Sequence, residues 1–425
     1  MKKHSKVLVS ALTLMMVATT LVGCGSKDNS SNAGTAGTET KKVTINFWEQ
    51  DDDKTQKVLD TLIKDFQTKN TNITVKRTHY ETEELRKQFV SSAQGGAGAD
   101  VVLGPNDNIG TFATGSLIQP ADGIVSADFL KTLDSKSLDA AKYQGKQYMV
   151  PDRNGNELLL IYNKKLVSQA PKTFEELIDI SKKLQADKKV QNGLVFNEVE
   201  PFFTIPYLAA FGGKVFDDVN SASPKPTLDT QAVKAWMSFI KNLHDDGIIP
   251  KEATDTVPDS LFKDGKVAFI VNGPWSFGDY QKANVDFGIA AIPSINGKDP
   301  APMSAVKGYL VSASVKDSAK KDAVKKFIEF MNTKDSQLAM VAAHSQLPTN
   351  LDALKDDKIT KDPLILGQKD QLDKSIPMPI VPQMRAIWDA MKPVQQEVLT
   401  GKTKSADASA SMQQKAEKGI KDLGL

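Results

Sequence analysis

The sequence predicts an α/β protein built from two domains. Its N-terminal part alternates short apolar, strand-like runs with segments of helical periodicity, the pattern of a parallel sheet with helical crossovers. From Lys42 to Leu425 the chain has 384 residues. A single hydrophobic core usually stops growing at about 250–300 residues. Two domains are therefore expected.

The N-terminal part has the order strand, helix, strand, helix, strand. Strands are expected at Val43–Trp48, Ile73–Val75 and Asp100–Leu103, which are short apolar runs. Helices are expected at 58–66 and 83–93, where apolar residues recur at helical spacing. This order predicts parallel strands joined by right-handed crossovers.

The carboxyl ends of these strands are polar. Glu49–Asp53, His79–Glu81 and Gly104–Asn108 follow the three strands and are rich in carboxylates and amides. Ligands of open α/β sheets bind beyond the carboxyl ends of the strands. These loops are therefore the expected ligand side.

Further elements follow along the chain. Thr173 to Glu176 reads Thr-Phe-Glu-Glu, a capping-box pattern that starts a helix. A proline-rich break precedes a last predicted helix around Trp388. The other predicted strands are 158–162, 267–271 and 309–312, and the other predicted helices are 231–244, 320–331 and 335–343.

Cys24 is the only cysteine in the chain, and it ends a segment typical of a secretory signal. Three lysines precede an apolar run at 7–22, which is shorter than the about 20 residues of a membrane-spanning helix. The ending Leu-Val-Gly-Cys resembles the bacterial lipobox. That resemblance implies cleavage before Cys24 and attachment of a lipid to it. The alternatives are an uncleaved anchor helix or an incidental cysteine.

The N-terminal segments are therefore predicted to be a lipoprotein signal peptide at 1–23 and a disordered tether at 24–41. Residues 25–41 contain no Val, Ile, Leu or aromatic side chain, so they cannot bury a core. The mature protein is expected outside the cytoplasm, anchored to the cell membrane by its N-terminal lipid.

Composition excludes some classes of partner. Removing residues 1–23 takes away three lysines, so 51 basic and 52 acidic residues remain and the net charge becomes −1. Nucleic-acid binding selects basic patches, so no nucleic-acid partner is expected. With Cys24 lipidated, no disulfide is possible.

The sequence shows no familiar catalytic or metal-binding motif. His79, His244 and His344 are scattered and lack metal-ligand spacing, so neither a metal nor another cofactor is expected. The glycine-rich run at 95–98 lacks the Lys-Ser/Thr ending of a phosphate loop, and no Gly-x-Ser-x-Gly elbow occurs. A glycoside hydrolase needs only two placed carboxylates and stays an alternative.

Five short motifs in fixed order carry a family resemblance; they lie at 157–163, 171–176, 200–206, 270–275 and 382–388. In this order they resemble the maltose/maltodextrin-binding proteins, the extracellular solute-binding family of ABC sugar importers. The resemblance spans nearly all of 43–425. It implies a periplasmic-binding-protein-like fold of two lobes, each a mostly parallel sheet flanked by helices.

The resemblance also implies a hinge of three chain crossings, near 154–158, 305–309 and 358–363. The N-terminal lobe is then predicted at 42–154 and 309–358. The C-terminal lobe is predicted at 158–305 and 364–425.

Candidate ligand residues follow from matching this chain to the family motifs. The resemblance implies that Trp275 and Trp388 stack on sugar rings and that Phe202 replaces the usual Tyr. Glu200 is expected to accept hydrogen bonds from sugar hydroxyls. Aromatic planes suit the apolar faces of a pyranose, and carboxylates suit its hydroxyls.

Acidic ligand residues are expected in the N-terminal lobe as well. The matches there are Asp107 and one of Asp52 and Asp53. Near the first crossing the acid is Glu157 or Asp152, because this segment holds one extra residue.

Two positions depart from the family pattern. Arg385 lies one turn before Trp388 and can reach the same ligand, although the family does not usually use a residue there. Gly104 stands where the family commonly has Trp, which favours a sugar other than maltose in length or linkage.

Each assignment has a structural alternative. Trp48 and Trp236 are expected in the core, and so is Phe203. Glu200 also suits a helix N-terminus, and Asp107 suits an N-cap.

The sequence therefore predicts a lipid-anchored, monomeric, non-enzymatic protein. It would capture an oligosaccharide, maltodextrin or maltose first, by hinge closure and deliver it to the permease subunits of an ABC importer. The alternatives are another oligosaccharide, a cyclodextrin or a polyol. Two alternatives belong to other classes: a glycoside hydrolase using Glu200 and Asp107, and an adhesive lipoprotein without a small ligand.

Overall fold

The computed structural model describes residues 42–219, 221, 223–254 and 256–425. The predicted signal peptide, Cys24 and the predicted tether lie outside the described residues. Within the described part, no helix is both long and apolar enough to span a bilayer.

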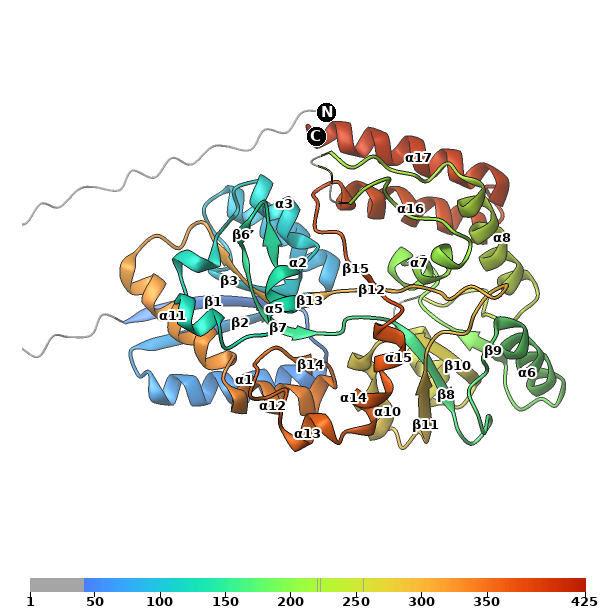
Figure 1. Ribbon diagram of the computed structural model, residues 1–425, viewed down its shortest axis with the longest axis horizontal. Helices are drawn as coiled ribbons and strands as arrows, with labels where there is room; N and C mark the ends of the chain where they lie inside the picture. Colours follow the sequence, from blue (N-terminus) through green and yellow to red (C-terminus); the bar gives the residue numbers. More distant parts are fainter. Residues whose placement is uncertain (1–41, 220, 222, 255) are drawn as a thin grey trace, which may run out of the picture. The chain divides into compact units, whose positions relative to one another are not determined.

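The first sheet is built largely from the N-terminal part of the chain (Figure 1). Its strands in spatial order are β14 (Leu347–Pro348), β7 (Met149–Asn154), β13 (Val306–Ser312), β3 (Val101–Pro105), β1 (Val43–Glu49) and β2 (Ile73–His79), and β4 (Ile118–Gln119) pairs with β13. Strand β1, next to the edge strand β2, is parallel to both β2 and β3. The later strand β13 is antiparallel to β3 and β7, and β14 is antiparallel to β7.

The second sheet has the order β11 (Phe287–Ala290), β8 (Leu159–Asn163), β10 (Val267–Asn272) and β9 (Asn192–Val195). Strands β9 and β10 are parallel, and β8 is antiparallel to β10 and to β11. Most strands of each sheet thus run in one direction. This is the two-lobe, mostly parallel architecture that the sequence predicted.

Three passages of the chain connect the two sheets. The first runs from β7 to β8 through residues 155–158. The second runs from β11 to β13 through the short strand β12 (Met303–Ser304), which pairs with β15 (Ile376–Pro377). After β14 the chain returns to the second sheet, where Gly367 lies against Ile289 of β11. The exact lobe boundaries stay a prediction.

Helices cover both sheets. On the first sheet the helices are α1 (Asp53–Lys69), α2 (Thr82–Gln94), α3 (Asn108–Thr114), η1 (Ala121–Gly123), α4 (Ala127–Leu130), α5 (Ser135–Asp139), α11 (Ser318–Met331) and α12 (Lys334–His344), with the small hairpin of β5 (Lys142–Tyr143) and β6 (Lys146–Gln147). Helix α1 packs because its buried residues repeat at helical spacing: Leu59, Leu62, Ile63 and Phe66 all face the core.

The helices of the second part are α6 (Phe174–Ala186), α7 (Pro201–Ala210), α8 (Gln231–Asp245), α9 (Val257–Lys263), η2 (Pro274–Ser276), α10 (Phe277–Lys282), α14 (Pro363–Gly367), α15 (Lys369–Leu372), α16 (Met384–Leu399) and α17 (Ser405–Asp422). Helix α13 (Asp357–Thr360) lies on the third passage, and its Ile359 packs with Leu338 and Val341 of α12. Thr173 caps α6 as predicted, since its hydroxyl accepts a hydrogen bond from Glu176 N at 3.2 Å. The last two helices, α16 and α17, pack side by side and also contact α8 (Figure 1).

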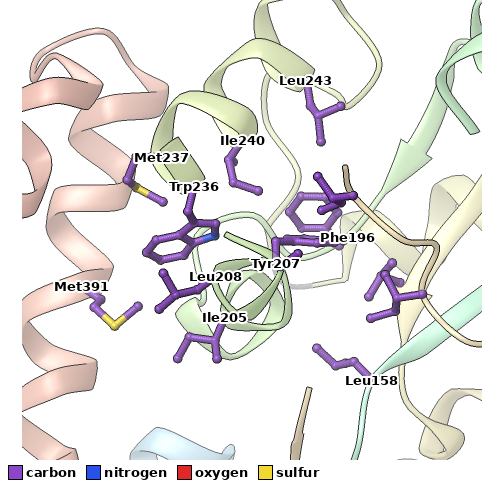
Figure 2. Close-up of a cluster of buried hydrophobic side chains, with 14 of the residues drawn as sticks. Leu158, Phe196, Ile205, Tyr207, Leu208, Trp236, Met237, Ile240, Leu243 and Met391 are labelled. Atoms are coloured by element: carbon purple, nitrogen blue, oxygen red, sulfur yellow. The ribbon is translucent and has the colours of Figure 1, made fainter. Parts of the chain in front are cut away.

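The core of the second part surrounds Trp236 of α8 (Figure 2). The Trp236 side chain is fully buried, and its Nε1 donates a hydrogen bond to Thr204 O at 3.0 Å. Leu208 of α7 and Met391 of α16 belong to the same cluster. The predicted core role of Trp236 is confirmed. Trp48 is half-buried and packs against Tyr80, with ring centroids 4.9 Å apart.

Candidate ligand-binding site

The three predicted aromatic ligand residues come from three elements of the second part. Phe202 lies in α7, Trp275 in η2 and Trp388 in α16, and all three are partly buried against the same hydrophobic core. The Phe202 and Trp275 rings are close, with centroids 6.5 Å apart. Each ring therefore keeps some exposed surface while its position is set by core packing. Phe203, predicted to be core, is also partly buried against that cluster.

Gly273 explains how Trp275 is held. A Cβ atom at this glycine would lie only 2.0 Å from Trp275 Cζ3. No other residue leaves room for the indole to lie directly against the backbone here. The Asn-Gly-Pro-Trp sequence at the end of β10 therefore fixes the ring orientation.

Glu200 occupies the N-cap position of α7, but its side chain makes no capping hydrogen bond. Its carboxylate instead forms an ion pair with Lys392 of α16. Lys392 lies one turn beyond Trp388 on α16, and Glu200 lies two residues before Phe202. Each member of the ion pair is therefore close in sequence to a predicted aromatic ligand residue. Sequence reasoning missed Lys392, because a lysine on a long helix is usually only a solvent-exposed charge.

Asp107 is held by Arg86 of α2. Arg86 Nη2 donates to Asp107 Oδ2 at 2.9 Å, and Arg86 Nε donates to Asn108 Oδ1 at 2.6 Å. Asp107 makes no capping hydrogen bond to α3, although it stands at the N-cap position. The capping alternative is therefore not what the structure shows for this side chain.

Arg385 connects the two parts of the molecule. Its Nη1 donates to Glu83 Oε2 of α2 at 2.5 Å, and its Nε donates to Asp389 Oδ2 at 2.8 Å. Glu83 also accepts from Arg86 at 2.8 Å. Burial raises the pKa of Glu83, but the two guanidinium groups outweigh it and the net pKa is lowered. The ion pairs thus run from Asp107 through Arg86 and Glu83 to the helix that carries Trp388.

Asp52 and Asp53 differ in what they do. Asp52 caps α1, since its Oδ1 accepts from Lys54 N at 2.9 Å and Thr55 N at 3.0 Å. Its Oδ2 accepts from the Thr55 hydroxyl at 2.8 Å. Asp53 is exposed in the first turn of that helix. A ligand contact of either residue stays a prediction.

A buried charge cluster lies between β1 and β7, and sequence reasoning did not find it. Asp51 and Arg153 form an ion pair while only 3% and 1% of their side chains are exposed. Arg153 also donates to Asp152 Oδ2 at 3.0 Å, and Lys307 Nζ lies 3.5 Å from Asp51 Oδ1. Burial alone raises the pKa of Asp51, but Arg153 and Lys307 lower it to about 2.

This cluster separates the two candidate acids at the first crossing. Asp152 is engaged by Arg153 and by the Tyr309 hydroxyl, 3.2 Å away. Glu157 is fully buried, and neither of its carboxylate oxygens has a hydrogen-bond partner among the described residues. Burial raises the pKa of Glu157 to about 7. Of the two acids, Glu157 is thus the one whose carboxylate oxygens are not engaged by other described residues, and a ligand contact of either acid stays a prediction.

The raised pKa of Glu157 predicts a pH-dependent stability. Its pKa rises from 4.5 to about 7 on folding, so burial of the charge costs about 3 kcal/mol above pH 7 and nothing below pH 4.5. The free energy of unfolding of Glu157→Gln, relative to the wild type, should therefore increase as pH rises from 4.5 to 8. Chemical denaturation across this range measures the difference.

The control is Glu175→Gln, which removes an exposed carboxylate in the first turn of α6. Its difference from the wild type should stay nearly constant with pH. A pH-independent difference for Glu157→Gln would show that folding does not raise the pKa of this carboxyl group.

Comparison with known proteins assigns the chain to a family. A family described as bacterial extracellular solute-binding protein matches residues 61–367. The chain belongs to this family of solute-binding proteins. The matched region includes the second sheet, every strand of the first sheet except β1, the aromatic residues of α7 and η2, and the Asp107 loop.

Relatives of this solute-binding protein have sugar ligands in their names. A maltotriose-binding protein of Pyrococcus abyssi is 28% identical over 80% of this chain and 74% of that protein. A galactooligosaccharide-binding protein of Bacillus subtilis is 27% identical over 94% of this chain and 93% of that protein. A maltooligosaccharide ABC transporter solute-binding lipoprotein of Streptococcus pneumoniae is 25% identical over 93% of each chain.

One solved structure is similar in both fold and sequence. It is the maltose/maltodextrin-binding domain MalE from Bdellovibrio bacteriovorus bound to maltotriose, with a TM-score of 0.85 and 39% identity. The match covers 89% of this chain and 100% of that one.

Two surface hollows lie in the second part of this solute-binding protein. One, of about 510 Å³, lies between α6 and α8, and the other, of about 730 Å³, borders Glu198 and His244. Neither is lined by a predicted ligand residue. The part of the chain that the structure describes contains no cluster of three or more His, Cys, Asp or Glu suited to a metal ion.

Proposed function

We propose that this solute-binding protein captures an oligosaccharide, of the maltooligosaccharide type first, and delivers it to an ABC importer. The observation that carries the proposal is the group of three half-buried aromatic rings, Phe202, Trp275 and Trp388, anchored in one core. Their exposed faces suit the apolar C–H faces of glucose rings. Maltotriose in the similar solved structure and in the name of a relative supports the choice of sugar.

The acidic residues would bind the sugar hydroxyls. Asp107 Oδ1 is buried without a hydrogen-bond partner in the described part of the chain, as are both oxygens of Glu157. A buried acceptor without a hydrogen-bond partner destabilises the protein, because it has lost its hydrogen bonds to water. A ligand hydroxyl that donates to this acceptor removes that cost. In this mechanism the aromatic rings provide affinity, and the carboxylates select the orientation of the sugar.

Hinge closure would bring the two lobes together around the ligand. The Glu83–Arg385 ion pair joins α2 to α16 directly, and Gly110 of α3 lies against the backbone of residues 380–382. These contacts support a conformation in which the lobes touch. A ligand drives closure only if it binds more tightly to the closed form, which contacts on both lobes provide.

The proposed function is tested by titrating residues 42–425 with maltose, maltotriose, maltoheptaose, a cyclodextrin, a galacto-oligosaccharide and a xylo-oligosaccharide. Saturable tryptophan fluorescence and a raised melting temperature are expected for the maltooligosaccharides, because a ligand that binds only the native state stabilises it. A response restricted to another sugar would identify that sugar as the ligand. No change in fluorescence or melting temperature with any sugar of the panel would contradict the proposal.

A galacto-oligosaccharide is the second candidate ligand. It is favoured by Gly104, which leaves no aromatic ring at the end of β3, and by the relative from Bacillus subtilis that covers 94% of this chain. The titration panel above separates the two sugars.

An enzymatic role is not proposed. The two carboxylates of the glycosidase alternative are engaged by cations, Glu200 by Lys392 and Asp107 by Arg86. This arrangement suits accepting hydrogen bonds more than donating a proton. Incubation with maltoheptaose should therefore release no shorter sugars, as chromatography of the products will show.

Lipid anchoring at Cys24 is proposed from the lipobox resemblance and from the lipoprotein of Streptococcus pneumoniae. Full-length protein expressed in a bacterium should incorporate a palmitate label and sediment with membranes. Cys24→Ala should lose both properties, while Ser26→Ala, two residues further on, should retain them. Equal labelling of the Cys24→Ala protein would refute the anchor.

A further inference from the structure

Helix α3 begins with a buried amide, Asn108, whose donor is not used by the described part of the protein. Asn108 is 1% exposed, and its Nδ2 has no hydrogen-bond partner within the described residues. Its Oδ1 accepts a hydrogen bond from Arg86 Nε at 2.6 Å. Because a guanidinium can only donate, this bond fixes which side of the amide carries the free N–H groups.

Arg86 leaves a matching acceptor beside this donor. It binds Oδ2 of the neighbouring Asp107 at 2.9 Å, and Asp107 Oδ1 is buried without a partner among the residues described. One buried cation thus holds one oxygen of each side chain. What remains is an adjacent donor and acceptor with fixed orientation.

A second acceptor lies in the same place, at the end of β1. An ideal Cβ on Gly104 would lie 3.1 Å from Asn108 Nδ2 and 3.7 Å from Gln50 Oε1. Gln50 Oε1 is itself buried without a partner in the described chain. Both amides therefore lie beside the bare backbone of Gly104, where an added Cβ would press on Asn108 Nδ2 and only touch Gln50 Oε1.

We propose that Gln50 and Asn108 form a hydroxyl-selective subsite over Gly104, with Arg86 as its positioning residue. A sugar hydroxyl donates one hydrogen bond and accepts others, so it pairs with Asn108 Nδ2 as donor and with Gln50 Oε1 as acceptor. This subsite binds a ring by its hydroxyl edge, in contrast to the stacking of Trp275 and Trp388 on ring faces.

The subsite makes selectivity depend on hydroxyl configuration at this end of the ligand. A site built to hydrogen-bond a hydroxyl rejects the analogue that lacks it, because its buried polar groups stay unpaired. An aromatic platform at the same place would tolerate such an analogue. The inference rests on the proposed function, since it concerns the same oligosaccharide.

The test measures the affinity of maltotriose and of monodeoxy maltotrioses, one for each hydroxyl of the terminal rings, by calorimetry. Asn108→Asp keeps the acceptor for Arg86 and removes the free donor, so it preserves the contact that holds the loop. It should weaken maltotriose binding about 5- to 30-fold, and Gln50→Ala should act similarly. Gln94→Ala, an exposed amide at the end of α2, is the control.

The decisive readout is the loss of discrimination. The wild type should bind at least one monodeoxy maltotriose several-fold more weakly than maltotriose. The Asn108→Asp and Gln50→Ala proteins should bind that monodeoxy sugar and maltotriose with similar affinity. If the wild type binds maltotriose and both variants keep its affinity and its discrimination, the subsite is overturned and the proposed function stands. If the wild type binds neither maltotriose nor any sugar of the panel, the subsite and the proposed function are both contradicted.

Discussion

Replacing Arg153 with Met is expected to lower the free energy of unfolding by about 3–5 kcal/mol. Arg153 is 1% exposed and is the cation that joins Asp51 to Asp152. Its removal leaves two buried carboxylates, and the remaining ion-pair partner of Asp51 among the described residues is Lys307, whose Nζ lies 3.5 Å from Asp51 Oδ1. Urea denaturation of the unliganded protein measures the change.

The physical origin of this cost can be separated from lost packing. If the uncompensated carboxylates cause it, the triple variant Asp51→Asn, Asp152→Asn, Arg153→Met should be more stable than Arg153→Met alone. The matched control is Lys326→Met, which removes an exposed ion pair with Asp322 and should change stability by less than about 1 kcal/mol. A triple variant less stable than the single one would contradict the electrostatic explanation.

The pH dependence of Arg153→Met follows from the same charges. In the wild type the pKa of Asp51 is lowered from 3.8 to about 2, so its stabilising contribution is present above pH 3.8 and is lost as pH falls toward 2. Without Arg153, burial raises that pKa and the charged form is destabilising. The stability deficit of the variant should therefore shrink as pH falls from 7 to 4.

Replacing Trp275 with Ala is expected to weaken maltotriose binding about 10- to 100-fold, which corresponds to about 1–3 kcal/mol of buried apolar surface. The Trp275 ring packs beside Phe202 and is only partly buried. Calorimetry gives the affinity, and the ligand-induced rise in melting temperature should fall in parallel. Trp388→Ala should behave in the same way.

The control for Trp275→Ala is Phe330→Ala, which removes a partly buried aromatic ring from α11 on the first sheet. That variant should lose stability and keep its affinity. Unchanged affinity of the Trp275→Ala protein would remove Trp275 from the site and leave the ring as a packing residue.

The elements of the fold could be predicted from short stretches of sequence. Val43–Glu49 alternates buried and half-buried residues, and α1 buries one apolar stripe, so local periodicity was enough to place both. Thr173 and Glu176 marked the start of α6 three residues apart. These features depend on neighbours within one or two turns, which a sequence displays directly.

The direction of strand β13 could not be predicted from local periodicity. Val306–Ser312 is antiparallel to β3, although nearly 200 residues lie between them and only the hinge brings the strand back to the first sheet. Periodicity identifies a strand and carries no information on its partner.

The candidate site divides along the same line. The aromatic residues and acids were named from motifs that lie close in sequence, and their residue types alone suggested a sugar. The partners of those acids could not be named from the sequence. Arg86 reaches Asp107 from another helix, and Lys392 reaches Glu200 although 192 positions separate them in the sequence. A sequence shows the sign and length of a charged side chain. Its partner depends on which distant residues the fold brings within reach.

By itself, then, the sequence determined which residues form strands and helices and which chemical groups stand at the strand ends. Only the tertiary structure decided that Asp51 is bound by Arg153, that Glu157 has no hydrogen-bond partner among the described residues, and that the Gln50 and Asn108 amides lie beside Gly104. Local structure depends on interactions between near neighbours along the chain. Pairing of buried polar groups depends on which distant segments the chain crossings bring together.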